Sequence, residues 1–339
     1  MSTHMAEGSK TTQASRSERA AVSKGIRRTL TFFGQSPAWP LLMLLVVFFS
    51  VASPNFMTLF NISNMLTQSA IIGVLAVGLT PVFISGGVDL SVGSVVGFAA
   101  CLLVTLQPVI GLYPACIIAL LFGMGIGLFN GLVVEVFGLN SIIVTLAMML
   151  GIRSLTFLVF GSATISPDDY ELSDLVGMKI GIFTFDFLLF IALSGAIVLM
   201  LRYTSHGINT YAVGGNRRAA EDAGVNVAKH VVINFAVCGA TAALVGVVLV
   251  AQLGAAAPVF GQGYELLAII AVVLGGTKLA GGHGTVGGTM VAIGALIVLQ
   301  NGMSLLNVDV RFVTIIVGVV LILTLTLDRL LTGGPGASE

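Results

Sequence analysis

Ten stretches of this chain are apolar over 17 residues or more, and this pattern constrains the fold more than any other feature of the sequence. An α-helix needs roughly 17 to 25 apolar residues to cross the hydrocarbon core of a bilayer. Only 9% of the 339 residues are charged and 56% are hydrophobic, whereas a soluble domain is about 25% charged. We therefore expect an all-α polytopic membrane protein with about ten transmembrane helices. The stretches are 37–53, 64–85, 90–107, 113–135, 141–160, 183–202, 230–252, 264–281, 286–304 and 311–331.

The apolar region as a whole, 37–332, is expected to be one transmembrane domain. The second and third stretches, and likewise the eighth and ninth, are separated by very short connections, which leaves the division of each pair open. The domain follows a polar, basic tail over 1–36, whose residues 23–33 are expected to form a short helix at the membrane surface. A C-terminal tail over 333–339 completes the chain.

The distribution of charge predicts which side of the membrane each loop faces. Lys and Arg gather in the short cytoplasmic loops of membrane proteins. Eleven of the 15 basic residues lie in the N-terminal tail, in or next to the loop over 203–229, or at the end of the last stretch. The opposite loops carry mostly Asp and Glu. Ten crossings with this charge pattern place both termini in the cytoplasm.

Composition also excludes several classes of function. The 15 basic and 15 acidic residues balance, whereas a nucleic-acid-binding protein normally has a basic excess. The three cysteines lie inside apolar stretches and the four histidines are scattered, so no disulfide framework or metal site is expected. The phosphate-binding pattern Gly-x-x-x-x-Gly-Lys-[Ser/Thr] does not occur. We therefore expect no cofactor and no ATP site of this type in the chain itself.

The loop over 203–229 is the longest predicted on the cytoplasmic side. Asn216 is a good N-cap residue and Gly224 a good C-cap residue, and about two turns of helix fit between them. So short a helix is marginal alone, so we expect it to dock against a partner surface; the alternative is an ordinary solvated loop helix. Two pairs in this helix are spaced for i,i+4 ion pairs, Arg217 with Glu221 and Arg218 with Asp222.

The turn between the second and third stretches carries Asp89 and Ser91. We expect both to cap the next helix near the cytoplasmic interface. The alternative is that Asp89 lines or gates the inner end of a solute path, because an acid at membrane depth is costly and usually functional. Other polar residues inside the stretches are candidates for the same path, with interhelical hydrogen bonding as the alternative. The candidate path residues are Asn64, Gln68, Asp89, Ser91, Asn130, Asn234, Gln300 and Asn301.

Arg153 is the basic residue predicted to lie well inside the bilayer. A buried guanidinium needs partners in the bundle, so we expect it to pair with a carboxylate or with carbonyl groups. A structural role is favoured over contact with a solute.

Four short motifs occur in a fixed order along the chain. They are Gly86-Gly87-Val88-Asp89-Leu90-Ser91-Val92-Gly93-Ser94, Asn140-Ser141-Ile142-Ile143-Val144-Thr145-Leu146, Gly214-Gly215-Asn216-x-x-Ala219-Ala220-x-x-x-Gly224-Val225, and Gly281-Gly282-x-Gly284-Thr285-Val286-x-Gly288. Together they resemble the motifs of the permease subunits of ATP-binding-cassette (ABC) importers of the ribose, xylose and arabinose type. The third is similar to the Glu-Ala-Ala-x-x-x-Gly signature of binding-protein-dependent permeases, with Arg218 in place of the Glu. The resemblance covers roughly residues 40–330.

This resemblance implies a permease of the type II importer fold in a bacterial cytoplasmic (inner) membrane. The partners it implies are two ABC ATPase subunits or one tandem-domain ATPase, a second permease copy or a paralogue, and a periplasmic sugar-binding protein. The ATPase would bind ATP and Mg²⁺, and the solute would be a pentose, hexose, polyol or related small molecule. The residues expected to couple this chain to the ATPase are Gly214, Gly215, Asn216, Arg217, Arg218, Ala219, Ala220, Glu221, Gly224 and Asn226.

Two other functions remain open at this point. One is an ion-coupled secondary transporter in which Asp89 and Glu135 carry protons or sodium ions. Both residues are predicted near the inner edge of the membrane, whereas such sites usually lie at its midplane. The other is an ABC permease for branched-chain amino acids or nucleosides, against which the motif over 86–94 favours the sugar branch.

Overall fold

The computed structural model describes residues 38–167 and 171–309, together with residues 312, 315, 316, 318, 319, 322 and 326 of the C-terminal region. The predicted tails over 1–36 and 333–339 lie outside the described residues, and so does most of the tenth stretch, 311–331.

The described residues form seven helices that are long and apolar enough to cross a membrane, which confirms the all-α polytopic fold. Two further apolar helices are shorter, α2 (Ala38–Ala52) and α12 (Tyr264–Leu274). The count of ten crossings remains a prediction. The seven long helices are α3 (Leu59–Ile84), α4 (Val92–Ile110), α5 (Leu112–Phe137), α6 (Ser141–Phe160), α8 (Phe185–Tyr203), α11 (Val227–Leu253) and α13 (Val286–Leu305).

The predicted boundaries hold best where a strong local signal fixes them. Helix α6 begins and ends where the sequence predicts, because Asn140 caps it by accepting a hydrogen bond from the backbone N–H of Ile142, at 2.8 Å. The stretch 264–281 is not one helix. Helix α12 ends at Leu274, and Gly276 adopts a φ of 89°, a left-handed conformation that glycine tolerates. The chain then runs without a helix to the start of α13.

Helix α11 lies at the centre of the bundle and packs against α5, α4 and α3. Helices α3, α4, α11 and α13 are mostly buried, whereas most residues of α5, α6 and α8 are partly or fully exposed. Exposed leucine, isoleucine and phenylalanine side chains along α5 and α6 suit contact with lipid.

Three glycines on one face of α5 let α11 approach closely. A side chain at Gly127 would collide with the carbonyl oxygen of Phe235, and one at Gly131 would meet the backbone of Val232. Gly123 and Gly239 face each other in the same way, each against the carbonyl oxygen of the other. We call these four residues the glycine seam; its spacing is the small-x-x-x-small pattern of closely packed membrane helices.

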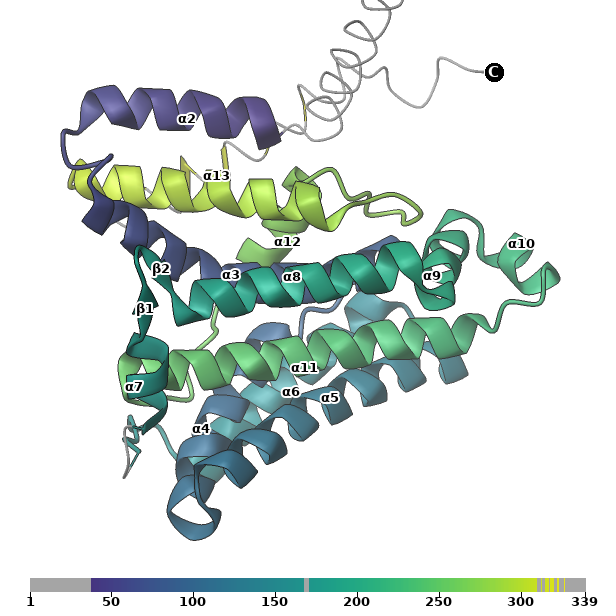
Figure 1. Ribbon diagram of the computed structural model, residues 1–339. Helices are drawn as coiled ribbons and strands as arrows, with labels where there is room; N and C mark the ends of the chain where they lie inside the picture. Colours follow the sequence, from purple (N-terminus) through teal and green to yellow (C-terminus); the bar gives the residue numbers. More distant parts are fainter. Residues whose placement is uncertain are drawn as a thin grey trace, which may run out of the picture.

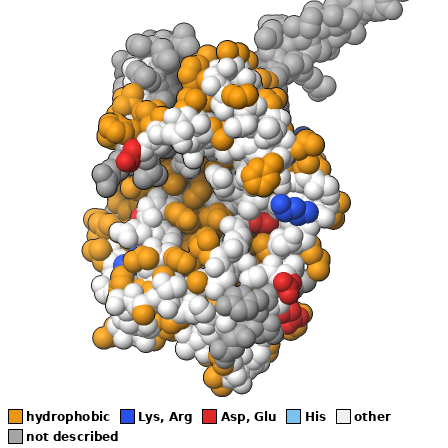
Figure 2. Space-filling model, turned by 90° about the vertical axis from the view of Figure 1, so that its left-hand side faces the viewer, with side chains coloured by type: hydrophobic (Ala, Val, Ile, Leu, Met, Phe, Trp, Pro, Cys, Tyr) orange, Lys and Arg blue, Asp and Glu red, His pale blue; other side chains and the backbone are white. Residues whose placement is uncertain are grey.

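Small elements mark the two ends of the bundle (Figure 1). One end carries α7 (Glu171–Gly177) and an antiparallel pair of two-residue strands, β1 (Lys179–Ile180) and β2 (Phe183–Thr184). The other end carries α9 (Ser205–Gly215) and α10 (Arg217–Asp222). Figure 2 views the end with α7; charged side chains are few there and hydrophobic side chains surround a hollow.

Candidate coupling and translocation site

Helix α10 is the short helix that the sequence predicts between Asn216 and Gly224. The side chain of Asn216 accepts a hydrogen bond from the backbone N–H of Ala219, at 3.0 Å, and so caps its first turn. Gly224 follows the helix with a φ of 82° and donates its N–H to the carbonyl of Glu221. Asn226 caps the next helix, α11, by accepting from the N–H of Lys229. Of the remaining α10 residues, Ala220 is buried.

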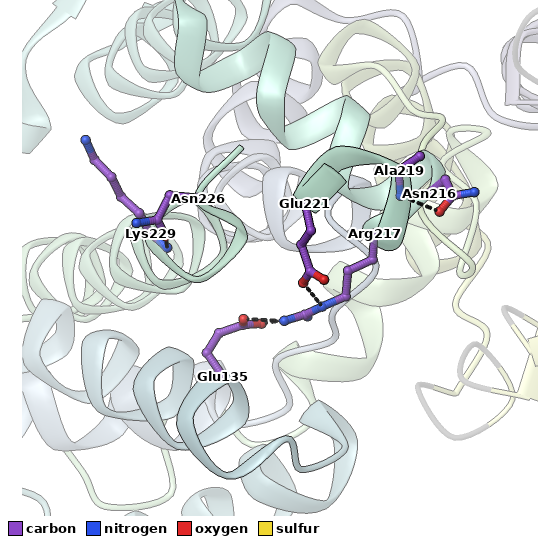
Figure 3. Close-up of polar contacts among 7 residues, drawn as sticks. All are labelled: Glu135, Asn216, Arg217, Ala219, Glu221, Asn226 and Lys229. Carbon is purple, nitrogen blue, oxygen red and sulfur yellow. Dashed lines mark hydrogen bonds and ion pairs between the residues drawn. The ribbon is translucent and has the colours of Figure 1, made fainter. Parts of the chain in front are cut away.

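Arg217 connects α10 to the end of α5. Its guanidinium makes a bidentate contact with the carboxylate of Glu135, with N···O distances of 2.6 and 3.0 Å, and a longer contact of 3.3 Å with Glu221 (Figure 3). The hydrogen bond with Glu135 raises the pKa of Arg217 above its ordinary value. The side chain of Arg217 is 52% exposed, whereas that of Glu135 is 3% exposed. This ion pair, in which the side chain of Glu135 is buried and that of Arg217 is not, links α10 to the end of α5.

Only one of the two predicted i,i+4 pairs forms. Arg217 and Glu221 make the contact, but within the described part of the chain Arg218 and Asp222 form no ion pair. Both are exposed on α10, where water satisfies their charges. Arg218 and Ala219 are therefore free surface of the kind that a docking partner would contact.

Helix α9, which precedes α10, was missed from the sequence. Thr204 caps it by accepting from the N–H of Gly207, at 3.2 Å. Its glycines, Gly207, Gly214 and Gly215, lower its intrinsic helix propensity, so the sequence pattern of this segment is that of a loop. Gly214 and Gly215, which the sequence places before the coupling helix, form the last turn of α9.

Histidines from α9 and α11 form a hydrogen-bonded network that the sequence also missed. The Nδ1 atoms of His206 and His230 are 2.8 Å apart, and the Nε2 atom of His206 lies 2.9 Å from the side-chain oxygen of Asn234. Asn209 contacts Nε2 of His230 at 3.0 Å. His206 and Thr210, and likewise His230 and Asn234, are spaced i,i+4, and this spacing was the available signal. Asn234 is thus held inside a helix–helix contact.

Asp89 is almost completely buried, at 1% exposure, and does not cap α4 as predicted. Its Oδ1 accepts from the backbone N–H and the hydroxyl of Ser91, at 2.8 and 2.6 Å, and neither side chain bonds to an N–H inside α4. The backbone N–H of the next residue, Leu90, donates to the hydroxyl of Thr145 on α6, at 3.1 Å. Asp89 is therefore buried between α4, α5 and α6, and its depth relative to the membrane stays a prediction.

A buried polar cluster surrounds Asp89. The amide nitrogen of Asn130 on α5 donates to the hydroxyl of Ser91, at 2.9 Å. Among the described residues, the second carboxylate oxygen of Asp89 and the side-chain oxygen of Asn130 have no hydrogen-bond partner. Three of the candidate path residues are thus brought together in one place.

The remaining candidate path residues lie elsewhere. Asn301 on α13 exchanges two hydrogen bonds of 2.9 Å with Asn61 on α3, a buried residue that the sequence analysis did not single out. Asn64, Gln68 and Gln300 are partly or fully exposed along α3 and α13. Between α3, α8 and α13 lies a cavity of about 290 Å³ with an almost wholly apolar lining, to which none of the candidate path residues contributes. Within the described residues, the candidate path residues do not line one common cavity, and their role in translocation stays a prediction.

Arg153 on α6 pairs with carbonyl groups, one of the two partners expected for it. Its Nη1 atom donates to the carbonyl oxygens of Pro258 and Phe260, each at 2.8 Å. The contact attaches the segment between α11 and α12 to α6.

Three motifs that are far apart in the sequence meet near α9. The backbone N–H of Gly282 donates to the carbonyl of Ile84 at the end of α3, at 2.8 Å. Gly214 of α9 lies against both of these groups, and Gly281 lies against Gly214 and Gly86. We call Gly86, Gly214, Gly281 and Gly282 the glycine junction.

Sequence similarity covers most of the chain. The family model described as branched-chain amino acid transport system / permease component matches residues 61–325. The ribose import permease protein of Escherichia coli (strain K12) is 37% identical over 296 residues, which are 85% of this chain and 91% of that protein. A probable ABC transporter permease protein of the same strain is 33% identical over 290 residues, 85% of this chain and 87% of that protein. Its galactose/methyl galactoside import permease protein is 31% identical over 321 residues, 89% and 96% of the two chains. No solved structure matches the chain.

Proposed function

We propose that this chain, which belongs to the family of branched-chain amino acid transport system / permease components, is the membrane-spanning subunit of an ABC importer. We propose further that the solute is a sugar. The observation that carries the proposal is that permeases named for ribose and for galactose import align with 85% and 89% of the chain. The bundle of long apolar helices supports it, because the solute must cross the bilayer through such a bundle.

In this proposal the chain does no covalent chemistry. ATP and Mg²⁺ bind to a separate ATPase, either two subunits or one tandem-domain protein, on the cytoplasmic side. A periplasmic binding protein delivers the sugar, and a second permease copy or paralogue completes the pathway.

Helix α10 is proposed to receive the push of the ATPase. It is short, exposed and held to the bundle by the Arg217–Glu135 pair, so a partner can dock on it without disturbing the core. Ala219 and the unpaired Arg218 lie on its surface. Closure of the ATPase would then switch the bundle between outward-open and inward-open arrangements by a movement of packed helices.

Both termini are proposed to lie in the cytoplasm, with ten crossings in all. The positions of α7 and α10 at opposite ends of the bundle support this orientation, because a single long helix, α8, runs between them (Figure 1). The basic N-terminal tail would then lie on the same side as α10.

Ion-coupled transport is less consistent with the geometry. Glu135, one of its two proposed ion carriers, is bound to Arg217. Asp89, the other, accepts two hydrogen bonds from Ser91.

Reconstitution in proteoliposomes tests the proposed function. The chain is purified with its ATPase and sugar-binding protein, and uptake of labelled ribose and galactose is measured with ATP and Mg²⁺, with ADP, and with a pH or sodium gradient alone. We expect uptake with ATP only, and only when all components are present. Gradient-driven uptake by this chain alone would instead establish the secondary transporter.

A further inference from the structure

The glycine junction joins α9 to two turns from distant parts of the chain. One turn, 85–91, follows α3 and carries Asp89; the other, 275–285, leads from α12 into α13. Their direct link is the hydrogen bond from the N–H of Gly282 to the carbonyl of Ile84, at 2.8 Å. Gly214 lies against the same two backbone groups, so the last turn of α9 closes the contact.

No side chain fits at the centre of this contact. A Cβ atom on Gly214 would collide with the carbonyl oxygen of Ile84, and one on Gly281 would approach the carbonyl oxygen of Gly214 and the backbone of Gly86 to 2.9 Å. Gly86, Gly281 and Gly282 also have φ values of 85°, 86° and 75°, which other residues rarely adopt. Backbone therefore touches backbone, and a displacement of one segment must displace the others.

Tyr211 strengthens the contact one turn earlier on α9. Its hydroxyl donates to the carbonyl of Gly284, at 2.9 Å. Tyr211 and Gly214 are three residues apart and lie on one face of the helix, so α9 holds the turn over 281–284 at two points.

The two ends of α9 are attached to different parts of the molecule. Near its start, His206 contacts His230 and Asn234 of the central helix α11. At its end, Gly215 is followed at once by Asn216, the cap of α10. A force on α10 is therefore applied to the junction end of α9, while the histidine network resists movement of the other end.

We propose that α9 acts as a lever which transmits movement of α10 through the glycine junction to the turns over 85–91 and 275–285, with Tyr211 and Gly214 as its positioning residues. This rests on the proposed function, because it takes an ATPase docked on α10 as the source of the force. The displaced turns are the starting points of α4 and α13, so both helices move with them. The first turn also bears the buried cluster of Asp89, Ser91 and Asn130.

Two variants and two matched controls separate transmission from simple packing. Tyr211→Phe removes one hydroxyl and keeps the ring, and Gly214→Ala adds one methyl group against Ile84. Gly287→Ala adds the same methyl at an exposed position on α13 with nothing within 4 Å. Tyr264→Phe removes a hydroxyl for which the described residues provide no hydrogen-bond partner. Each variant is purified in the complete complex with the ATPase and the binding protein.

The first measurement is sugar uptake per ATP hydrolysed in proteoliposomes. Loss of one hydrogen bond is expected to lower this ratio roughly two- to tenfold in Tyr211→Phe. Gly214→Ala should lower it further, while hydrolysis itself continues and both controls match the unaltered complex. An unchanged ratio in both variants, or hydrolysis and uptake that fall in proportion, would overturn the proposal.

The second measurement does not depend on the solute. Amide hydrogen exchange is compared with and without ATP and Mg²⁺ in the two turns. In the unaltered complex ATP should change exchange over 85–91 and 275–285, and in Tyr211→Phe and Gly214→Ala this response should be reduced. A response in the turns without uptake of ribose or galactose would refute only the assignment of the sugar. ATP-driven uptake without any response in the turns would refute only the lever.

Discussion

Glycine brings backbones into contact in two regions of this molecule, and the two contacts differ in construction. In the glycine seam, Gly123, Gly127 and Gly131 lie inside the regular helix α5, directly against the backbone of α11. In the glycine junction, three of the four glycines lie in turns with positive φ, at the ends of helices. The seam is a long contact between two elements, whereas the junction is a small contact among three.

This difference indicates different mechanical roles. A seam of interlocked helices resists sliding, because every residue along it would have to separate from its neighbours. The junction is held by the Gly282–Ile84 hydrogen bond, the Tyr211–Gly284 hydrogen bond and close backbone packing. We infer that the seam fixes the fold and that the junction is where the fold can be moved.

The largest effect on stability is expected from a substitution in the glycine seam. Gly127→Ala places a methyl group against the carbonyl of Phe235, which is backbone and cannot rotate away. We expect the free energy of unfolding in detergent to fall by about 2–3 kcal/mol, as in other overpacked cores. Gly125→Ala is the control, because it lies in the same helix with nothing within 4 Å. Since alanine is the better helix former by about 1 kcal/mol, the control should be neutral or stabilised. Equal thermal stability of the two variants would contradict a close-packed seam.

A smaller loss of stability is expected when the Asn61–Asn301 pair, which joins α3 to α13, is broken. Asn301→Leu leaves the buried side-chain oxygen of Asn61 without its donor, while the amide nitrogen of Asn61 keeps the carbonyl of Phe56, and should cost about 1–2 kcal/mol. Replacing both residues by Leu should recover part of that loss, because no unpaired amide then remains. A double-mutant cycle of thermal unfolding measures this coupling. Strictly additive effects would show that the two amides do not depend on each other.

The sequence predicted features that depend on local signals better than it predicted contacts between distant segments. The long apolar helices, the boundaries of α6 and the capping of α10 by Asn216 follow from local signals, namely hydrophobic length and cap residues. The burial of Asp89 could not be predicted, because it depends on Asn130 of α5 and Thr145 of α6, which bond to its neighbours Ser91 and Leu90 only in the tertiary fold. The Asn61–Asn301 pair and the junction likewise join segments that only the tertiary fold brings together.

The local stability of α10 should depend more on the ion pair between Glu135 and Arg217 than on the other polar contact of Arg217. Glu135→Gln removes the charge that holds Arg217 and keeps the shape of the side chain. We expect α10 to open locally more often, by about 1 kcal/mol, with global stability changed much less, because Arg217 is half exposed and water solvates it after the loss. Amide hydrogen exchange over 217–222 measures the opening. Exchange that accelerates equally in α5, α10 and α11 would show that the pair supports the fold and not α10 alone.

The smallest effect on the local opening of α10 is expected for Glu221→Gln, which removes the second, longer contact of Arg217, within α10 itself. Both side chains are about half exposed, at 52% and 50%, so the pair is worth about 0.3–0.5 kcal/mol at low salt. Screening should abolish the difference in exchange between this variant and the unaltered chain in 1 M salt, where the Debye length is about 3 Å. The effect of Glu135→Gln should persist in part, because that carboxylate is only 3% exposed and is shielded from salt. Equal salt sensitivity of the two variants would place Glu135 in solvent and remove the attachment of α10 to α5.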